Sequence, residues 1–243
     1  MTAQTMRTGD DLPLFELEAP EREGFTPLVR KRPRRRNRVL RTPSARRALR
    51  YFKPGHDLEV HTGGEFSLLD LTLALLDWTG PASDVVIDTW SVGLYDAEVL
   101  AHALEAGRLR SVRFVIDVTV KNNIGSRAYA PELMRVFGAE NVRTTRTHSK
   151  FVIVTNDDGA AYSVSSTANL NENLRAELFY VSDDPERAAW YLGIVERLFA
   201  EVPEGWNPDT GMAALKGLDP AGSPIRRGDA RRNRGTIRVG GGA

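Results

Sequence analysis

Two short apolar segments constrain the fold of this chain most strongly. Residues 84–90 (DVVIDTW) and 111–118 (SVRFVIDV) are rich in β-branched residues, which is typical of strands in a buried sheet. Segments with a helical pattern, 66–80 and 94–107, precede and separate them. Strands that alternate with helices predict an α/β sandwich with a mixed β-sheet.

The helical segments carry their own start and stop signals. Ser67 is a candidate N-cap, and Gly80 and Gly107 are expected to end the first two helices. Residues 130–138 predict a short helix, and a long amphipathic helix is expected to start near Asp184.

The third group of strands is predicted to begin with a β-hairpin. The segments SKFVIVTN and AAYSVSS flank a turn at Asp157-Asp158-Gly159, and ELFYVSD (177–183) reads as a further strand. The hairpin returns the chain beside its own start, so residues at 148–150 and 166–169 are expected to meet.

Charge is strongly segregated along the chain, although the net charge is only +1. Residues 1–28 are acidic, residues 29–50 hold eleven Lys and Arg and no acid, and residues 225–243 hold six Arg against one Asp. Between them, residues 51–224 carry 25 acidic and 14 basic residues. We therefore expect a folded domain over 51–205, a disordered acidic and then Arg-rich arm over 1–50, and a flexible basic tail over 206–243.

An acidic body repels phosphate, so the basic arms would have to supply any attraction for nucleic acid. The run at 29–50 is either a solvated arm or a phosphate-binding one. The candidate nucleic-acid contacts are Arg30, Lys31, Arg32, Arg34, Arg35, Arg36 and Arg38.

Several classes of site are excluded by composition. The chain has no Cys, which rules out disulfides, Cys-ligated zinc and thiol catalysis and fits a cytoplasmic protein. No apolar run approaches the ~20 residues that span a bilayer, so integral membrane association is not expected. The acidic N-terminus does not predict a secretory signal. The sequence offers no convincing metal cluster, and no metal or cofactor is expected.

One group of side chains has the composition of a phosphoryl-transfer site. His148 and Lys150 are two residues apart and would share a strand face; Thr167 and Asn169 have the same spacing after the return strand. A neutral His can attack phosphorus and carry a covalent phosphoryl group. Lys and Asn can bind the non-bridging oxygens as negative charge develops on them.

These residues resemble the signature of the phospholipase D-like superfamily, HxKxxxxD followed by GSxN. His148-x-Lys150 matches, Ser166-Thr167-Ala168-Asn169 stands where GSxN is expected, and Glu177 takes the place of the acid that precedes the next strand. The resemblance covers roughly residues 60–200. It implies a phospholipase D-like α/β/α sandwich with flexible termini, in which His148, Lys150, Asn169, Thr167 and Glu177 form the catalytic site.

The sequence departs from the family pattern at two points. Thr155 replaces the family Asp, and the interval from His148 to Asn169 is longer than usual. A longer hairpin accounts for the interval and could bring Asp157 or Asp158 near the missing position; the alternative is a site that has lost activity.

The resemblance implies a metal-independent phosphodiesterase, with a nuclease that cuts DNA or RNA through a phosphohistidine as the favoured interpretation. Because the HxK motif occurs once, it also implies a homodimer with two motifs at a two-fold axis. Two alternatives remain. One is a catalytically inactive nucleic-acid-binding or assembly protein with the same fold, and the other is a phospholipid hydrolase.

Overall fold

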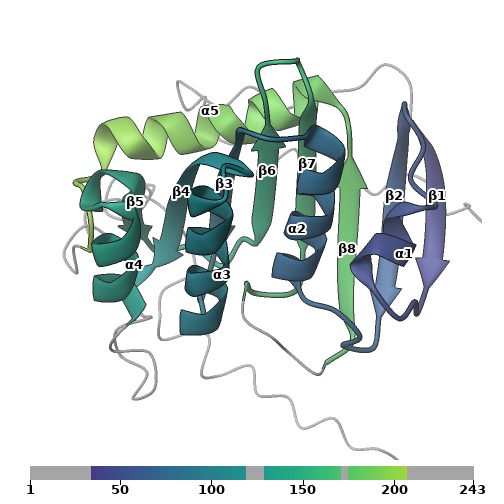
Figure 1. Ribbon diagram of the computed structural model, residues 1–243, viewed down its shortest axis with the longest axis horizontal. Helices are drawn as coiled ribbons and strands as arrows, with labels where there is room; N and C mark the ends of the chain where they lie inside the picture. Colours follow the sequence, from purple (N-terminus) through teal and green to yellow (C-terminus); the bar gives the residue numbers. More distant parts are fainter. Residues whose placement is uncertain (1–33, 119–128, 171–174, 207–243) are drawn as a thin grey trace, which may run out of the picture.

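A mixed β-sheet organises residues 34–118, 129–170 and 175–206, the parts of the chain that the computed structural model describes (Figure 1). Its eight strands in these residues follow the order β1-β2-β8-β7-β6-β3-β4-β5. Pairing is parallel for β1/β2, β3/β4 and β4/β5 and antiparallel for the other neighbours. The strands are β1 (Arg35–Leu40), β2 (His56–Thr62), β3 (Ser83–Thr89), β4 (Leu109–Asp117), β5 (Val142–Thr145), β6 (Phe151–Thr155), β7 (Ala161–Ser166) and β8 (Glu177–Ser182).

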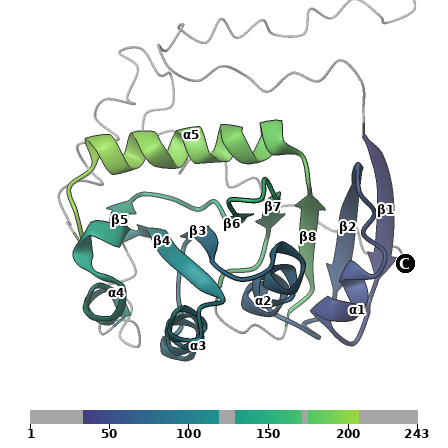
Figure 2. The ribbon, with the colours of Figure 1, turned by 45° about the horizontal axis from the view of Figure 1, so that its top comes forward.

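Helices cover both faces of this sheet, as Figure 2 shows from a second direction. One face is covered by α1 (Ala45–Leu49), α2 (Leu68–Thr79), α3 (Leu94–Glu105) and α4 (Tyr129–Phe137), and the other by α5 (Pro185–Glu201). The larger hydrophobic core lies under α1 to α4, and a smaller one joins α5 to β3, β4 and β6. The predicted α/β/α sandwich with a mixed sheet is confirmed.

The local signals in the sequence act as predicted at the helix ends. The Ser67 hydroxyl caps α2 by accepting from the Asp70 backbone N–H at 3.1 Å, and the Ser67 N–H donates to the Asp70 carboxylate at 2.8 Å. Asp184 caps α5 through the Glu186 N–H at 3.1 Å. Gly107 follows α3 with φ +70°, a conformation that favours glycine.

Strand direction brings several strand ends to one edge of the sheet, the lower edge in Figure 1. The C-terminal ends of β3 and β4 lie there because these strands are parallel. The starts of β6 and β8 join them because β6 is antiparallel to β3 and β8 is antiparallel to β7. The ends of β7, β2 and β1 follow from the same registers. We call this the site edge.

The expectation that residues 1–50 are disordered is wrong for residues 34–50, which form β1 and α1. Val39, Ala48 and Leu49 are buried in the larger core. The prediction missed them because the dense Arg run masks a few apolar positions. The folded unit thus begins earlier than residue 51. Residues 1–33 and 207–243, which hold the acidic segment and the predicted tail, lie outside the described residues.

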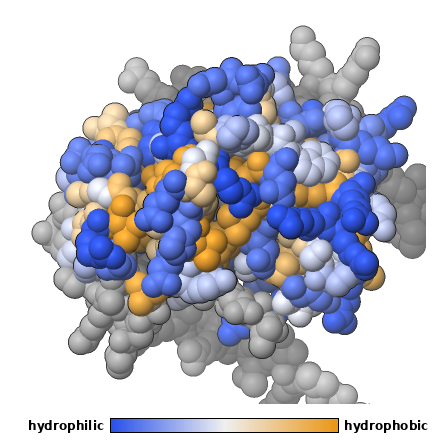
Figure 3. All heavy atoms as spheres, in the orientation of Figure 1, coloured by the Kyte–Doolittle hydropathy of each residue, from blue (hydrophilic) through white to orange (hydrophobic). Residues whose placement is uncertain are grey.

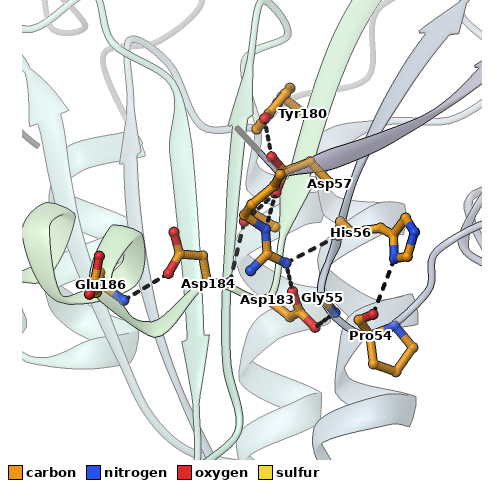
Figure 4. Close-up of polar contacts among 10 residues, drawn as sticks. Pro54, Gly55, His56, Asp57, Tyr180, Asp183, Asp184 and Glu186 are labelled. Carbon is orange, nitrogen blue, oxygen red and sulfur yellow. Dashed lines mark hydrogen bonds and ion pairs between the residues drawn. The ribbon is translucent and has the colours of Figure 1, made fainter. Parts of the chain in front are cut away.

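A buried carboxylate ties β1 into the sheet. Asp57 on β2, which is 6% exposed, accepts hydrogen bonds from Tyr180 Oη and from Ser182 Oγ (2.7 Å) on β8 (Figure 4). Arg34 places its Nε 3.0 Å from Asp57 Oδ1 and forms a second ion pair with Asp183. The guanidinium thereby supplies the positive charge that a carboxylate needs when it is removed from water.

No helix in the described ranges is both long enough and apolar enough to cross a bilayer.

We predict that Arg34→Ala lowers the free energy of unfolding by about 3 kcal/mol, because it leaves the Asp57 carboxylate buried without its cation. Arg35→Ala is the matched control, since Arg35 is exposed, and its effect should stay below about 0.5 kcal/mol. Urea unfolding of both variants measures the difference. Equal midpoints for the two variants would show that the Arg34 ion pairs do not hold β1.

Candidate active site at one edge of the sheet

His148 and Lys150 lie at the site edge, in the segment that leads into β6. They were expected on the strand itself, whereas the strand begins at Phe151, one residue later. The two side chains nevertheless converge. Lys150 Nζ lies 3.4 Å from His148 Nδ1 and donates a hydrogen bond to the His148 carbonyl at 2.8 Å. His148 is exposed, so its imidazole can reach a ligand in solvent.

Lys150 is a buried residue whose ammonium is affected by the charges of two carboxylates. Lys150 is 8% exposed, and this burial lowers the pKa of its ammonium. The negative charges of Asp88 and Glu177 raise that pKa and partly offset the effect of burial. A buried cation that is only partly compensated favours the approach of an anion such as phosphate.

Asp88, near the end of β3, supports the segment that carries His148. Its Oδ1 accepts a hydrogen bond from Thr147 Oγ1 at 2.8 Å, and Thr147 Oγ1 lies 2.7 Å from Ser149 Oγ. Burial raises the pKa of Asp88 to about 6, despite hydrogen bonds from Thr147 and Ser149 and the charge of Lys150. Asp88 thus fixes the backbone on both sides of His148.

Thr167 and Glu177 form the second part of the site. Thr167 follows the end of β7, and its hydroxyl donates to the Glu177 carboxylate at the start of β8. Thr167 Oγ1 also accepts from the Leu178 N–H at 2.9 Å. The Ser166 N–H bonds to the Lys150 carbonyl at 2.8 Å, so Thr167 comes directly beside the HxK segment.

Asn169 lies on a segment that crosses the start of β6. This segment is fixed at one end by Thr167 N–H on the Leu178 carbonyl (3.1 Å) and at the other by Leu170 N–H on Thr89 Oγ1 (3.2 Å). The Asn169 Oδ1 atom is buried and has no hydrogen-bond partner within the described residues. Its carboxamide therefore keeps hydrogen-bonding capacity for a ligand.

A surface pocket of about 330 Å³ adjoins His148. It is lined by Trp90, Asp117, Arg146, Thr147 and His148. The Trp90 ring lies beside the imidazole, with 6.4 Å between ring centroids. A pocket of this volume has room for a phosphate group beside His148.

The substitution of Thr155 for the family Asp lies away from these groups. Thr155 ends β6, five residues after Lys150 and therefore about 16 Å along the strand. It faces Asp84 on β3, and Arg110 forms ion pairs with both Asp84 and Asp157. Asp157 thus lies at the Thr155 end of β6, as the longer hairpin suggested, and this substitution leaves the groups at the site edge unchanged.

The arginines that were predicted to bind phosphate lie in different surroundings. Arg34 is half-buried and forms ion pairs with Asp57 and Asp183, so the fold already compensates its charge. Arg36 lies 3.1 Å from Glu59 and over the Tyr180 ring, and Arg38 lies 3.5 Å from Glu59. Arg35 is exposed. Arg30, Lys31 and Arg32 lie outside the described residues.

Five residues of the site were missed by the sequence analysis: Asp88, Trp90, Asp117, Arg146 and Thr147. Asp88 and Asp117 had a usable signal, because each ends an apolar run in a strand that is parallel to its neighbour. Polar residues at the carboxyl ends of parallel strands often line a binding crevice. Trp90 and Arg146 gave no such signal. Within the described residues, no group of three His, Asp or Glu could hold a metal ion.

No family model matches the chain, and no curated protein matches it. Solved structures do. A phospholipase D family member, Nuc from Salmonella typhimurium, has 16% identity and a TM-score of 0.45; the match covers 61% of this chain and 96% of that one. NucT from Helicobacter pylori has 15% identity and a TM-score of 0.44, over 61% and 99% of the two chains.

Phosphatidylserine synthase from Haemophilus influenzae has 20% identity and a TM-score of 0.42, over 67% of this chain and 45% of that one. The first of these structures is described as a member of the family that the HxK motif resembles. Because all three TM-scores lie below 0.5, the function proposed below is inferred from this chain's own residues.

We predict that Asp88 makes the stability of the protein depend on pH. Its pKa is raised in the folded state, so the folded protein binds the proton more tightly than the unfolded chain. The contribution of Asp88 to the free energy of unfolding is therefore fully present below pH ~4. This contribution, about 3 kcal/mol, is lost as the pH rises through about 6. Asp88→Asn should remove this loss, since its amide oxygen can still accept from Thr147.

Urea unfolding at pH 4 and pH 7.5 measures the effect, with Asp158→Asn at the exposed turn as control. The difference in the free energy of unfolding between Asp88→Asn and the parent should increase with pH. The corresponding difference for Asp158→Asn should not change with pH. A constant difference between parent and Asp88→Asn at both pH values would contradict the buried carboxyl.

Proposed function

We propose that this chain is a metal-independent phosphodiesterase of the phospholipase D-like type that cleaves nucleic acid through a phosphohistidine. The single observation that carries the proposal is the contact of a buried ammonium, Lys150, with an exposed imidazole, His148. Thr167 and Glu177 complete the group from the neighbouring strands.

In the first step, His148 attacks the phosphorus and the bond from phosphorus to the leaving oxygen breaks. The leaving oxygen takes a proton from a general acid, and the phosphoryl group stays on the imidazole. In the second step, water attacks the phosphorus, loses a proton to the same group acting as base, and releases the phosphate monoester from His148.

Lys150 and Asn169 are assigned to the non-bridging oxygens. Lys150 is buried, so its charge acts through a medium of lower dielectric constant than water and stabilises the developing negative charge strongly. Glu177 keeps Thr167 in place and lies close enough to Lys150 to act on its pKa. Asp88 is a positioning residue, which acts through Thr147.

We assign the general acid to His148 of the partner subunit in a homodimer. The motif occurs once in the sequence, and the mechanism needs a second titratable group on the opposite side of phosphorus. The exposed position of His148, beside an open pocket, is compatible with a partner surface that closes the site.

His148→Ala should reduce cleavage of bis(p-nitrophenyl) phosphate and of labelled single-stranded DNA by a thousandfold or more, because the nucleophile is removed. The assay contains EDTA, and parallel samples offer RNA and phosphatidylcholine as substrates. An acid-quenched reaction of the parent should contain a phosphorylated protein species that His148→Ala lacks.

His102→Ala is the control, since His102 is an exposed histidine on α3 whose Nδ1 lies 3.2 Å from the Glu105 carboxylate. Its activity should stay within twofold of the parent. Equal cleavage by His148→Ala and the parent would refute His148 as the nucleophile. Binding of DNA without cleavage by the parent would support the inactive binding protein. Hydrolysis of phosphatidylcholine alone would support the phospholipid hydrolase.

The dimer makes a separate prediction. Sedimentation equilibrium at micromolar concentration should give twice the chain mass of 26.9 kDa, and specific activity should fall on dilution below the dissociation constant. A monomer that is fully active at micromolar concentration would rule out the shared site.

A further inference from the structure

A second basic surface lies beyond the site just described. A pocket of about 690 Å³ lies between the end of β1, the loop 41–43 and α1. Arg38, Arg41, Arg47, Arg50 and Tyr51 line it, and none of its lining residues in the described chain is acidic. We call it the β1–α1 pocket. Figure 3 shows strongly hydrophilic side chains on this side of the molecule, at the right.

Two of its four arginines carry charge that no acid of the described chain neutralises. Arg47 and Arg50 are exposed and form no ion pair within the described residues. Arg41 lies 2.7 Å from Glu65, and Arg38 lies 3.5 Å from Glu59 at the edge of the pocket. In a protein whose body is acidic, such a cluster is a local site for an anion.

The pocket also presents apolar surface to solvent. Tyr51 is 57% exposed and Leu40 is 77% exposed, and both residues line the pocket beside the guanidinium groups. An exposed aromatic ring among arginines is the arrangement on which unpaired bases stack while their phosphates bind the cations. A simple inorganic anion could bind the arginines but could not stack on the Tyr51 ring.

The fold holds these groups in place. Ala45, Ala48 and Leu49 bury the inner face of α1, so Arg47 and Arg50 project from its outer side. Asn37 Nδ2 donates to the Tyr51 carbonyl at 2.8 Å and links β1 to the end of α1. A fixed backbone at these positions lowers the conformational entropy that is lost when a ligand binds.

Arg41 joins the pocket to the site edge. It has a left-handed backbone (φ +46°), which is costly for a residue other than glycine, and its N–H donates to the His61 carbonyl at 2.8 Å. Its guanidinium packs against Gly63, where an added Cβ would come within 3.0 Å of it. Thr62, the neighbour of Gly63, pairs with Glu177 of the candidate active site.

The pocket and the active site therefore lie along one line of strand ends. From His148, just before β6, to the end of β1 is four strand spacings, or about 19 Å. A stacked strand rises about 3.4 Å per nucleotide, so this gap corresponds to roughly six stacked nucleotides and to fewer in an extended single strand.

From these observations we infer that the β1–α1 pocket binds the flanking segment of a single-stranded nucleic acid, a few nucleotides from the scissile phosphate. Arg47 and Arg50 bind phosphates, and Tyr51 stacks on a base. This inference rests on the proposed function, whose substrate class it narrows from nucleic acid in general to single strands.

The test measures binding rather than cleavage. His148→Ala protein is titrated in EDTA against a fluorescent 20-nucleotide single strand, the same sequence as a duplex, and a 3-nucleotide fragment. Adding Arg47→Ala and Arg50→Ala should weaken single-strand binding at low salt and lower the slope of log affinity against log salt by about 1.4. Between 50 and 200 mM salt, that slope change is a factor of about seven.

Two further variants separate the contributions. Arg47→Lys with Arg50→Lys keeps the charges and should retain most of the salt slope. Tyr51→Ala should weaken binding of the 20-nucleotide strand by at least fivefold, as loss of one stacked base predicts, and should change binding of the 3-nucleotide fragment much less.

Arg135→Ala with Arg197→Ala is the matched control, because it removes the same charge from surface pairs with Glu132 and Glu201. Its slope should equal that of the His148→Ala parent. Equal slopes for both double variants, tighter binding of duplex than of single strand, or arginine-dependent binding to phosphatidylserine vesicles without binding to the oligonucleotide would each overturn the inference. Cleavage that fails while arginine-dependent binding persists would overturn the proposed function alone.

Discussion

The antiparallel pairing of β6 with β3 is the constraint on which the candidate site depends. Phe151 pairs with Asp88, so the residues that precede β6 meet the carboxyl end of β3. A parallel β6 would carry His148 and Lys150 to the opposite edge of the sheet. The hairpin to β7 and the return to β8 then bring Thr167 and Glu177 to the same place, and backbone hydrogen bonds fix all of these strand ends relative to one another.

A buried charge gives this edge its chemical character. The Lys150 ammonium is removed from water, and Asp88 and Glu177 act on it from two strands. Asp88 is itself buried deeply enough for its pKa to rise to about 6. The protonation states of these groups are therefore coupled, because each charge is sensitive to its neighbours in a medium of low dielectric constant.

The arginine run shows how one composition serves two purposes. Arg34 is used by the fold, since it neutralises Asp57 inside the sheet, whereas Arg47 and Arg50 remain on the surface of α1. Charge density in the sequence made these residues look alike. Their surroundings distinguish them, because Asp57 and Asp183 compensate the charge of Arg34 within the fold.

The sequence by itself determined helices α2 to α5, most strands and the α/β class, because periodicity, Ser67 and Asp184 as caps, and the turn at Gly159 are local signals. It also predicted that the side chains of His148 and Lys150 meet, because residues two apart in the extended segment before β6 lie on the same side. Only the tertiary structure decided that 34–50 joins the sheet, that Asp88 and Trp90 belong to the site, and that Thr155 lies at the far end of its strand. Those facts depend on strand order and burial, which arise from contacts between residues that are distant in the chain.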